Sequence, residues 1–426
     1  MKIDSIEIID FRGIEKRKFS FNKNFNVLIG ENGSGKTSVL EALAVAINSY
    51  LYVSQDNKNI RPIRKEDVRV FNFGPSLEEK INTEIIIHGE LDGIQLEWTV
   101  KKPNRSWGFM QGDDKKLKDM ARQHKNELSI DGGRNLLLPA FNYLGSGRLW
   151  LDPYNPTKKV NTLPKGSRYE GYTDALRGTS SLKRFTQWYK TITLSALQGN
   201  TDSKWREKVI ERAISNCLEG WDSVYFDVEE DALMALKKSD AGVRKLPVSF
   251  LSDGQRNIIG IIADIAYRCI LLNPYLEYRA AEETPGIVLI DELDLHLHPK
   301  WQKKIVGNLK TTFPKIQFIT TTHSPFIIQS LKNKELFDMD GKELDTDYFR
   351  KSIDEITKEE MGVDILRSEK FNNMMAIAEE YFKLIKQTKS DDLFKIKELK
   401  NKLKEYEIEF SEDPAYVALL KSELPK

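Results

Sequence analysis

Eight consecutive residues near the N-terminus have the types and spacing of a phosphate-binding loop. They run Gly30-Glu31-Asn32-Gly33-Ser34-Gly35-Lys36-Thr37 and match the pattern G-x-x-x-x-G-K-[S/T] without a gap. Glycines let successive backbone N–H groups turn inward around a phosphate, and a following helix N-terminus adds partial positive charge. Lys36 supplies an ammonium group for the terminal phosphates, and Thr37 supplies a hydroxyl for Mg²⁺. We therefore expect phosphate contacts from Gly30, Asn32, Gly33, Ser34, Gly35, Lys36, Thr37 and Ser38.

Two carboxylates follow an apolar run much later in the chain. Residues 287–290 are all Ile, Val or Leu, and Asp291 and Glu292 come directly after them. Such a run is typical of a buried parallel strand, and ligands bind at the carboxyl ends of these strands. We expect Asp291 to hold Mg²⁺ through water and Glu292 to act as general base on the attacking water. His323 follows the next expected strand, residues 317–321, where it can reach a γ-phosphate.

The elements that would position these residues alternate between strand and helix patterns. Residues 25–29 indicate a strand before the loop, and residues 39–47 have the apolar spacing of a helix after it. Residues 251–256 open a second helix, with Ser252 placed to cap it. The other expected elements are further strands within 1–29, a hairpin over 82–100 turned at Leu91-Asp92-Gly93, a strand over 136–144, a loop over 145–178, helices over 181–220, a hairpin over 224–236, a helix over 254–272, strands over 286–290 and 317–321, and a helix-rich tail over 353–424 with two amphipathic helices joined at Ser390-Asp391-Asp392.

Composition limits the class of protein. The chain has 426 residues, 40% of them hydrophobic and 30% charged, which is typical of a globular protein with two or three structural units. The formal net charge of +1 gives no global basic field, so any nucleic-acid contact must come from local patches. Cys217 and Cys269 are far apart and outside any metal or disulfide pattern. With no secretory leader and no run of about 18 apolar residues, we expect a cytoplasmic protein without a membrane contact.

In this order, the loop, residues 251–255, the carboxylate pair and His323 resemble the motifs of ABC-type ATPase heads. Residues 251–255 are similar to the LSGGQ signature, with Asp253 in place of its first glycine. The resemblance implies an α/β fold: a mixed or parallel sheet core, an antiparallel β lobe and a helical lobe, followed here by a C-terminal helical hairpin. It implies ATP and Mg²⁺ as cofactors. It also implies a homodimer, or a higher homo-oligomer, in which Ser252, Gly254 and Gln255 of one copy cover the ATP held by the other.

The N-terminus resembles one branch of these heads. Phe11-Arg12-Gly13 is similar to the N-F-R motif of the chromosome-maintenance (SMC) and RecF-like heads, and this resemblance implies that Arg12 reaches a phosphate. Residues 30–33 and 291–299 also resemble that branch rather than transporter heads. Residues 143–148 stand where the family has a glutamine loop, but they contain no glutamine. No long heptad tract lies between the phosphate loop and residue 251, so the chain cannot form the coiled-coil arms of SMC proteins.

Three further segments resemble the standalone ATPases of bacterial anti-phage systems, the Septu and retron-associated ATPases. They are residues 139–150, 361–363 and 410–416. The resemblance implies a slow ATP hydrolase that restrains or directs a partner HNH-type nuclease. The alternative is a RecF-like clamp for DNA repair or recombination that acts on DNA ends or gaps; a transporter head ranks last. DNA is a candidate partner in both leading hypotheses, with Lys16-Arg17-Lys18 and the loop around Arg105 and Trp107 as candidate contacts.

Three other features admit two interpretations. His296 and His298 could form a metal pair, but no third ligand is near, so an ordinary loop is favoured. Asp338-Met339-Asp340 could be half of a nuclease metal site, but Asp340-Gly341 favours a hairpin turn, and we expect no nuclease site in this chain. The tail helices either pack against the head or form an oligomer or nuclease-docking surface.

These patterns predict four regions. Residues 1–150 form an N-terminal ATPase lobe with the phosphate loop and a β subdomain, and residues 151–250 form a helical lobe with a hairpin. Residues 251–335 form the ATPase lobe with the signature, the carboxylates and His323. Residues 336–426 form a C-terminal helical region for oligomer formation or partner docking.

Overall fold

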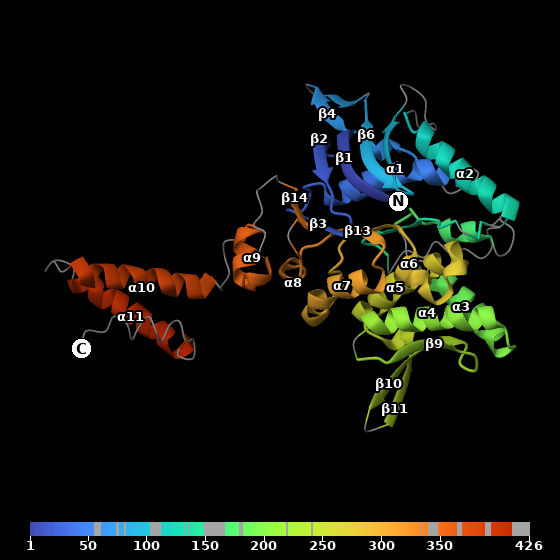
Figure 1. Ribbon diagram of the computed structural model, residues 1–426. Helices are drawn as coiled ribbons and strands as arrows, with labels where there is room; N and C mark the ends of the chain where they lie inside the picture. The colour runs from blue at the N-terminus through green and yellow to red at the C-terminus, as the bar shows by residue number, and fades with distance from the viewer. Residues whose placement is uncertain are drawn as a thin grey trace. The chain divides into compact units, whose positions relative to one another are not determined.

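The computed structural model places the chain in two compact units, residues 1–356 and 357–426, which are described separately (Figure 1). The described residues are 1–54, 61–73, 76–80, 82–102, 112–131, 133–134, 136–148, 167–178, 182–218, 220–239, 242–332, 334–339, 348–363, 369–387 and 393–410. The first unit contains all the motif residues. The finer division of the chain into four regions stays a prediction.

A central parallel sheet carries the motifs at its carboxyl edge. Its strand order is β14–β3–β13–β12–β8, and every adjacent pair is parallel. The bounds are β3 (Phe25–Ile29), β8 (Ala140–Leu144), β12 (Gly286–Ile290), β13 (Ile316–Thr321) and β14 (Leu336–Asp338). Four of these strands, all but β14, are buried at every residue, which is why their sequences are mostly apolar and β12 is apolar throughout. Ile290 lies opposite both Leu144 and Thr320, so the residues that follow these strands meet at one edge.

Two strands differ from the sequence-based prediction. The strand expected over 136–144 begins at Ala140, and Leu336–Asp338 forms a strand that pairs in parallel with β3, which the sequence did not predict. The expected turn at Asp340-Gly341 lies outside the described residues. Because β14 joins the sheet beside the strand that leads into the phosphate loop, Met339 lies directly next to that loop.

An antiparallel sheet covers helix α1 (Lys36–Ser54) from the side opposite the central sheet (Figure 1). Its order is β2–β1–β6–β7, with β1 (Lys2–Phe11), β2 (Ile14–Ser20), β6 (Glu84–Leu91) and β7 (Ile94–Lys101). The predicted hairpin over 82–100 is confirmed: Asp92 and Gly93 both have positive φ, as a two-residue turn requires. A small pair, β4 (Val70–Phe73) and β5 (Ser76–Glu79), and helix α2 (Lys115–Asp131) complete this part.

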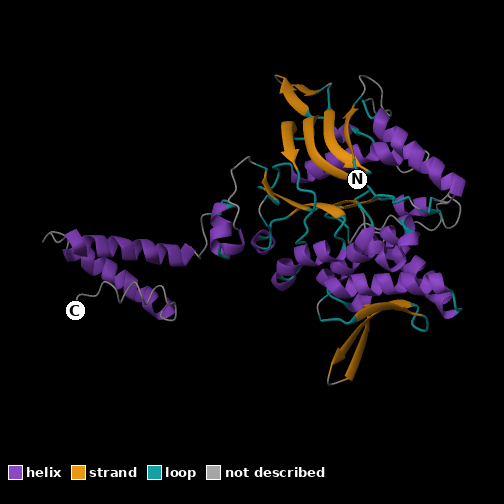
Figure 2. Cartoon of the chain, viewed as in Figure 1, coloured by secondary structure: helices purple, strands orange, loops and turns teal. Residues whose placement is uncertain are grey.

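A helical layer lies on the other side of the central sheet. It contains α3 (Leu182–Leu197), α4 (Thr201–Cys217), α5 (Asp253–Leu272) and α7 (Pro299–Thr312). Figure 2 shows these helices between the central sheet and a three-stranded sheet of β9 (Ser223–Asp227), β10 (Ala232–Ser239) and β11 (Gly242–Pro247). Strands β9 and β10 confirm the expected hairpin, whereas β11 was not predicted. Strand β11 is largely exposed and has no alternation of apolar and polar residues, so its sequence carries no strand signal.

The remaining elements are short or belong to the second unit. They are α6 (Ala280–Glu283), α8 (Pro325–Gln329), α9 (Ile353–Glu359), α10 (Glu369–Gln387), α11 (Leu393–Phe410) and 3₁₀ turns at Lys65–Asp67, Arg168–Tyr172, Val248–Phe250, Pro274–Arg279 and Tyr348–Arg350. Helices α10 and α11 pack on each other: Met374 and Ala378 are buried, as are Leu399 and Leu403. The predicted turn between them lies outside the described residues. No described helix combines the length and apolar character needed to cross a membrane.

Candidate functional site: a nucleotide site at the carboxyl edge of the central sheet

The phosphate loop connects β3 to α1 and is shaped by its glycines. Gly30, Gly33 and Gly35 have φ values of 148°, 86° and 98°. Gly30 also has close neighbours: a Cβ there would lie 2.9 Å from the Cβ of Met339 and 2.8 Å from Ser34 Oγ. The Met339 N–H donates to the Ile29 carbonyl at 2.8 Å and so holds β14 against the start of the loop. A side chain at position 30 would therefore displace either the loop or this strand.

Lys36 and Ser34 fit a phosphate ligand. The Lys36 ammonium is turned onto its own loop, where Nζ donates to the Gly30 and Glu31 carbonyls at 2.8 and 2.9 Å. Ser34 Oγ is buried without a hydrogen-bond partner. A buried hydroxyl without a partner is costly, and a phosphate oxygen in the loop would give it one. The loop geometry, the nearby ammonium and this hydroxyl thus fit the phosphates of a nucleotide.

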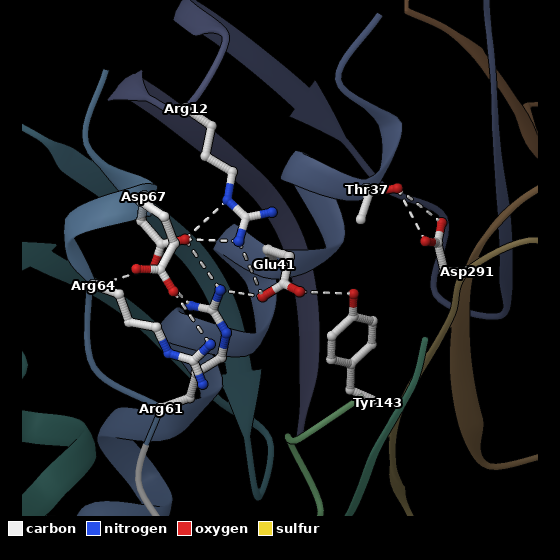
Figure 3. A network of polar contacts seen from close by, with 9 residues as sticks. Arg12, Thr37, Glu41, Arg61, Arg64, Asp67, Tyr143 and Asp291 are labelled. Atoms are coloured by element: carbon white, nitrogen blue, oxygen red, sulfur yellow. Dashed lines mark hydrogen bonds and ion pairs between the residues drawn. The ribbon is translucent and has the colours of Figure 1, made fainter. Parts of the chain in front are cut away.

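Thr37 and Asp291 meet across the gap between α1 and β12. Thr37 Oγ1 donates to the two carboxylate oxygens of Asp291 at 3.2 and 3.0 Å, although 254 positions separate the residues (Figure 3). Thr321 Oγ1 at the end of β13 donates to Asp291 Oδ1 at 2.7 Å. A hydroxyl and a single carboxylate are the hard oxygen donors that Mg²⁺ takes from proteins, with phosphates and waters as its other ligands. This donor set fits the predicted role of Thr37 and Asp291.

Glu292 is held by its backbone and its side chain is left available. Its φ is +50°, in the left-handed region that non-glycine residues rarely adopt. Its N–H donates to Thr321 Oγ1 at 2.7 Å, so one threonine hydroxyl binds the backbone of Glu292 and the carboxylate of Asp291. Glu292 directly follows Asp291, which contacts Thr37, and its side chain is half-buried. This arrangement fits a general base beside a metal-bound phosphate.

His323 lies in the turn after β13 and is positioned by Asp294. The His323 N–H donates to Asp294 Oδ1 at 3.3 Å, and Thr322 Oγ1 donates to the same oxygen at 2.5 Å. The imidazole itself is exposed. The other two histidines of this region lie in the loop before α7, where His298 Nδ1 accepts from the Lys300 N–H and caps that helix. His298 thus has a structural role, in line with the interpretation of an ordinary loop.

The signature segment begins helix α5 through a capping box. The Gln255 N–H donates to Ser252 Oγ at 3.4 Å, and the Ser252 N–H donates to Gln255 Oε1 at 3.1 Å. The Ser252 side chain is exposed. Gly254 is packed tightly: a Cβ there would lie 2.3 Å from the His296 carbonyl oxygen. Glycine is thus required at position 254 because the loop after Asp291 and Glu292 passes directly over it.

We expect Gly254→Ala to destabilise the protein by about 1–3 kcal/mol, because a methyl group has no space beside the His296 carbonyl. Gly307→Ala is the matched control: Gly307 lies inside α7, and a Cβ there meets nothing within 4 Å. The control should gain roughly 0.5–1 kcal/mol from helix propensity. Thermal unfolding of both variants measures the difference. Equal midpoints for the two would contradict the close packing of α5 on the loop.

Arg12 belongs to a buried ionic network beside the phosphate loop (Figure 3). Its Nε donates to Asp67 Oδ1 at 2.8 Å, and Arg61 binds both Asp67 and Glu41. Glu41 lies one turn after Thr37 on α1 and accepts from Tyr143 Oη at 3.0 Å. Burial alone would raise the pKa of Asp67, but the Arg61 and Arg12 guanidinium groups and a backbone N–H outweigh it and lower that pKa. The contact of Arg12 with a phosphate stays a prediction; its side chain is 25% exposed while it holds Asp67.

Sequence reasoning named the residues of the motifs but not those that hold them. It missed Thr321, Asp294, Asp67 and Arg148, all of which contact motif residues. Thr321 carries a weak signal, since it is a polar residue at the carboxyl end of an expected buried strand. Arg148 and Asp294 lie within segments 143–148 and 291–299, which the resemblance singled out, but no role was assigned to either residue. Asp67 carries no signal, because its partner Arg12 is distant in the sequence and no local pattern marks it.

Known proteins resemble this chain over most of its length. The Retron Vc95 probable ATPase of Vibrio cholerae serotype O1 biovar El Tor is 28% identical over 396 residues, which cover 79% of this chain and 73% of that protein. The Septu protein PtuA of Bacillus thuringiensis is 25% identical over 390 residues, which cover 86% of this chain and 85% of that protein. Among solved structures, an SmcHead bound to the C-winged helix domain of ScpA aligns with 79% of this chain and 94% of its own, at 16% identity and a TM-score of 0.47. A family model described as RecF/RecN/SMC N terminal domain matches residues 2–343.

Proposed function

This chain belongs to the RecF/RecN/SMC N-terminal domain family, and from that premise we propose that it hydrolyses ATP as a homodimer and thereby controls a separate nuclease in anti-phage defence. Proteins of this family are ABC-type ATPases, and the relatives of this chain include anti-phage defence proteins. The observation that carries the proposal is the meeting of Thr37 and Asp291 beside Glu292, at the mouth of a phosphate loop.

Each residue of the site has a separate chemical role in this proposal. The loop N–H groups and Lys36 bind and orient the phosphates, and the Lys36 ammonium exchanges its two loop carbonyls for phosphate oxygens. Thr37 and Asp291 would hold Mg²⁺, which would neutralise charge on the phosphates. Glu292 accepts the proton of the attacking water at its carboxylate. His323, on the next strand end, donates a hydrogen bond toward the γ-phosphate.

A second copy of the chain completes the site in this proposal. Ser252 is exposed at the N-terminus of α5, an end that carries partial positive charge and suits an anion. In a two-fold dimer each copy would present this end to the nucleotide held by the other, with Ser252, Gly254 and Gln255 at the contact. Closure then depends on the nucleotide, because ATP favours the closed arrangement only as far as it binds that arrangement more tightly.

The proposed partner is a nuclease of the HNH type. Its support is the similarity to a Septu protein and to a retron ATPase over most of the chain. In this proposal the ATP-bound dimer holds the nuclease inactive or licenses it on invading DNA, and slow hydrolysis releases that state.

A RecF-like clamp on DNA ends or gaps is the second candidate, and it is favoured by the family match itself. The clamp hypothesis requires that DNA raises the ATPase rate.

Co-purification from the native operon, followed by mass measurement with and without nucleotide, tests this proposal. With a non-cleavable ATP analogue and Mg²⁺ we expect a complex that contains two copies of the 49.1 kDa chain, or a higher even number, together with the mass of a co-purifying nuclease. A single copy at saturating nucleotide would contradict the dimer. A dimer that carries no nuclease but hydrolyses ATP faster with DNA would favour the clamp.

A further inference from the structure

Arg148 lies where the family has its glutamine loop, and its side chain contacts the backbone carbonyls of Asp291 and Glu292. It follows the end of β8 and is only 3% exposed. Its Nη1 donates to the Asp291 carbonyl at 2.6 Å and to the Gly145 carbonyl at 3.1 Å, and its Nη2 donates to the Glu292 carbonyl at 2.9 Å. One guanidinium group thus binds two successive backbone carbonyls at the carboxyl end of β12.

The backbone at Glu292 makes this double contact feasible. In a strand, successive carbonyl groups point in opposite directions, as successive side chains do. The φ of +50° at Glu292 breaks that alternation, so the carbonyls of residues 291 and 292 can both face Arg148. This conformation costs roughly 1–3 kcal/mol and persists only when its surroundings fix it. The planar fork of an arginine suits such fixing, because its donors have a set geometry. Burial lowers the pKa of Arg148 to about 10, so the group stays positively charged at neutral pH beside Asp291 and Glu292.

The Nε group of the same side chain contacts α5, the helix that begins at the signature segment. Arg148 Nε donates to Asn257 Oδ1 at 2.7 Å, and Asn257 lies on α5 five positions after Ser252. The Asn257 amide group in turn donates to the Leu295 carbonyl at 2.8 Å, in the loop that follows Glu292. Asn257 is 1% exposed, so both of its hydrogen bonds are made inside the protein. Arg148 and Asn257 therefore bridge α5 to both sides of Glu292.

We propose that Arg148 and Asn257 are positioning residues that couple the start of the signature helix to the orientation of Glu292. A displacement of α5 at Ser252 is transmitted through Asn257 to Leu295, and through Arg148 to the carbonyls of residues 291 and 292. The carboxylate of Glu292 is then in place for proton transfer only when α5 is correctly seated. This inference rests on the proposed function, in which the nucleotide of a second copy seats α5. It assigns Arg148 a different task from the metal contact of a glutamine.

The central test is Asn257→Ala, compared with Asp264→Asn. Asp264 is a buried polar residue two turns further along the same helix, where it accepts from Asn142 at 3.0 Å. We expect Asn257→Ala to lower kcat by about 10- to 100-fold, as a small misplacement of a catalytic group does. The dissociation constant for ATP should change less than about twofold, since the phosphate loop is untouched. Asp264→Asn should lower the unfolding midpoint about as much as Asn257→Ala does, but should keep the wild-type kcat.

Two further measurements separate positioning from loss of stability or charge. Arg148→Lys keeps the positive charge but not the fork, and should lose kcat as Asn257→Ala does. Hydrogen exchange at the amides of residues 292, 293, 295 and 297, which bond to Thr321, Glu292 and Asp294, should quicken in both variants and not in Asp264→Asn. Wild-type kcat and wild-type exchange in Asn257→Ala would overturn the inference. If the wild-type protein hydrolyses no ATP, the proposed function fails, and the exchange measurement still decides whether the link exists.

Discussion

Glu292→Gln is expected to reduce ATP hydrolysis by about 10²- to 10⁴-fold while leaving ATP binding intact. The glutamine amide has nearly the same shape as the carboxylate but cannot accept the proton of the attacking water. The contacts that fix Glu292 are made by its backbone, to Thr321 and Arg148, so the substitution leaves them in place. Phosphate release measures turnover, and titration with a fluorescent ATP analogue measures binding.

The same variant should accumulate the closed dimer, because the bound ATP is no longer consumed. Mass measurement with ATP and Mg²⁺ should show the dimer persisting for hours in Glu292→Gln and decaying in the wild type. Glu282→Gln is the matched control: Glu282 lies on α6, is 40% exposed and pairs with Arg212 away from the site. Hydrolysis by Glu292→Gln at the wild-type rate would show that another group is the base.

Lys36→Ala should lose most of its ATP binding at concentrations that just saturate the wild type. Charge-assisted hydrogen bonds contribute about 1.5–3 kcal/mol each, so the loss of the ammonium should weaken ATP by roughly 10- to 100-fold or more. Calorimetric titration with ATP and Mg²⁺ measures the affinity. The rise of the unfolding midpoint that ATP gives the wild type should also disappear.

In Lys36→Ala, the effect on the conformation of the phosphate loop must be separated from the loss of contacts to the phosphates. Lys36 Nζ binds the Gly30 and Glu31 carbonyls, so its removal also frees the loop. The unfolding midpoint without nucleotide reports that effect and should fall by no more than a few degrees. Lys16→Ala, at a 68% exposed side chain, should bind ATP normally. Normal ATP affinity in Lys36→Ala would mean that the loop is not the phosphate site.

Local patterns predicted the parts of the site that lie on the sheet. The run of residues 25–29 before the glycines, and the run of 287–290 before Asp291, identify buried strands whose ends carry polar residues. Parallel pairing then brings Thr37 and Asp291 together, as the sequence-based interpretation required. The fold class was expected from the resemblance to ABC-type heads, and the parallel central sheet with a separate antiparallel sheet confirms it.

The remaining parts depend on contacts that no local pattern records. Strand β14 has only three residues, and its pairing with β3 comes from tertiary packing around Met339. Helix α2 was not among the predicted elements; it is mostly polar and buries only a narrow stripe that includes Leu117, Ala121 and His124. The bridge from Arg148 to Asn257 joins residues 109 positions apart, and nothing near either residue in the sequence indicates its partner.

Helix α1 has almost no side that faces water. Most of its residues from Val39 to Leu51 are fully enclosed, and even the mid-helix carbonyl of Ala46 is taken by the Trp98 indole. The phosphate loop is therefore attached to a helix that is held between two sheets. A movement of the loop during nucleotide binding and release would have to carry both sheets with it.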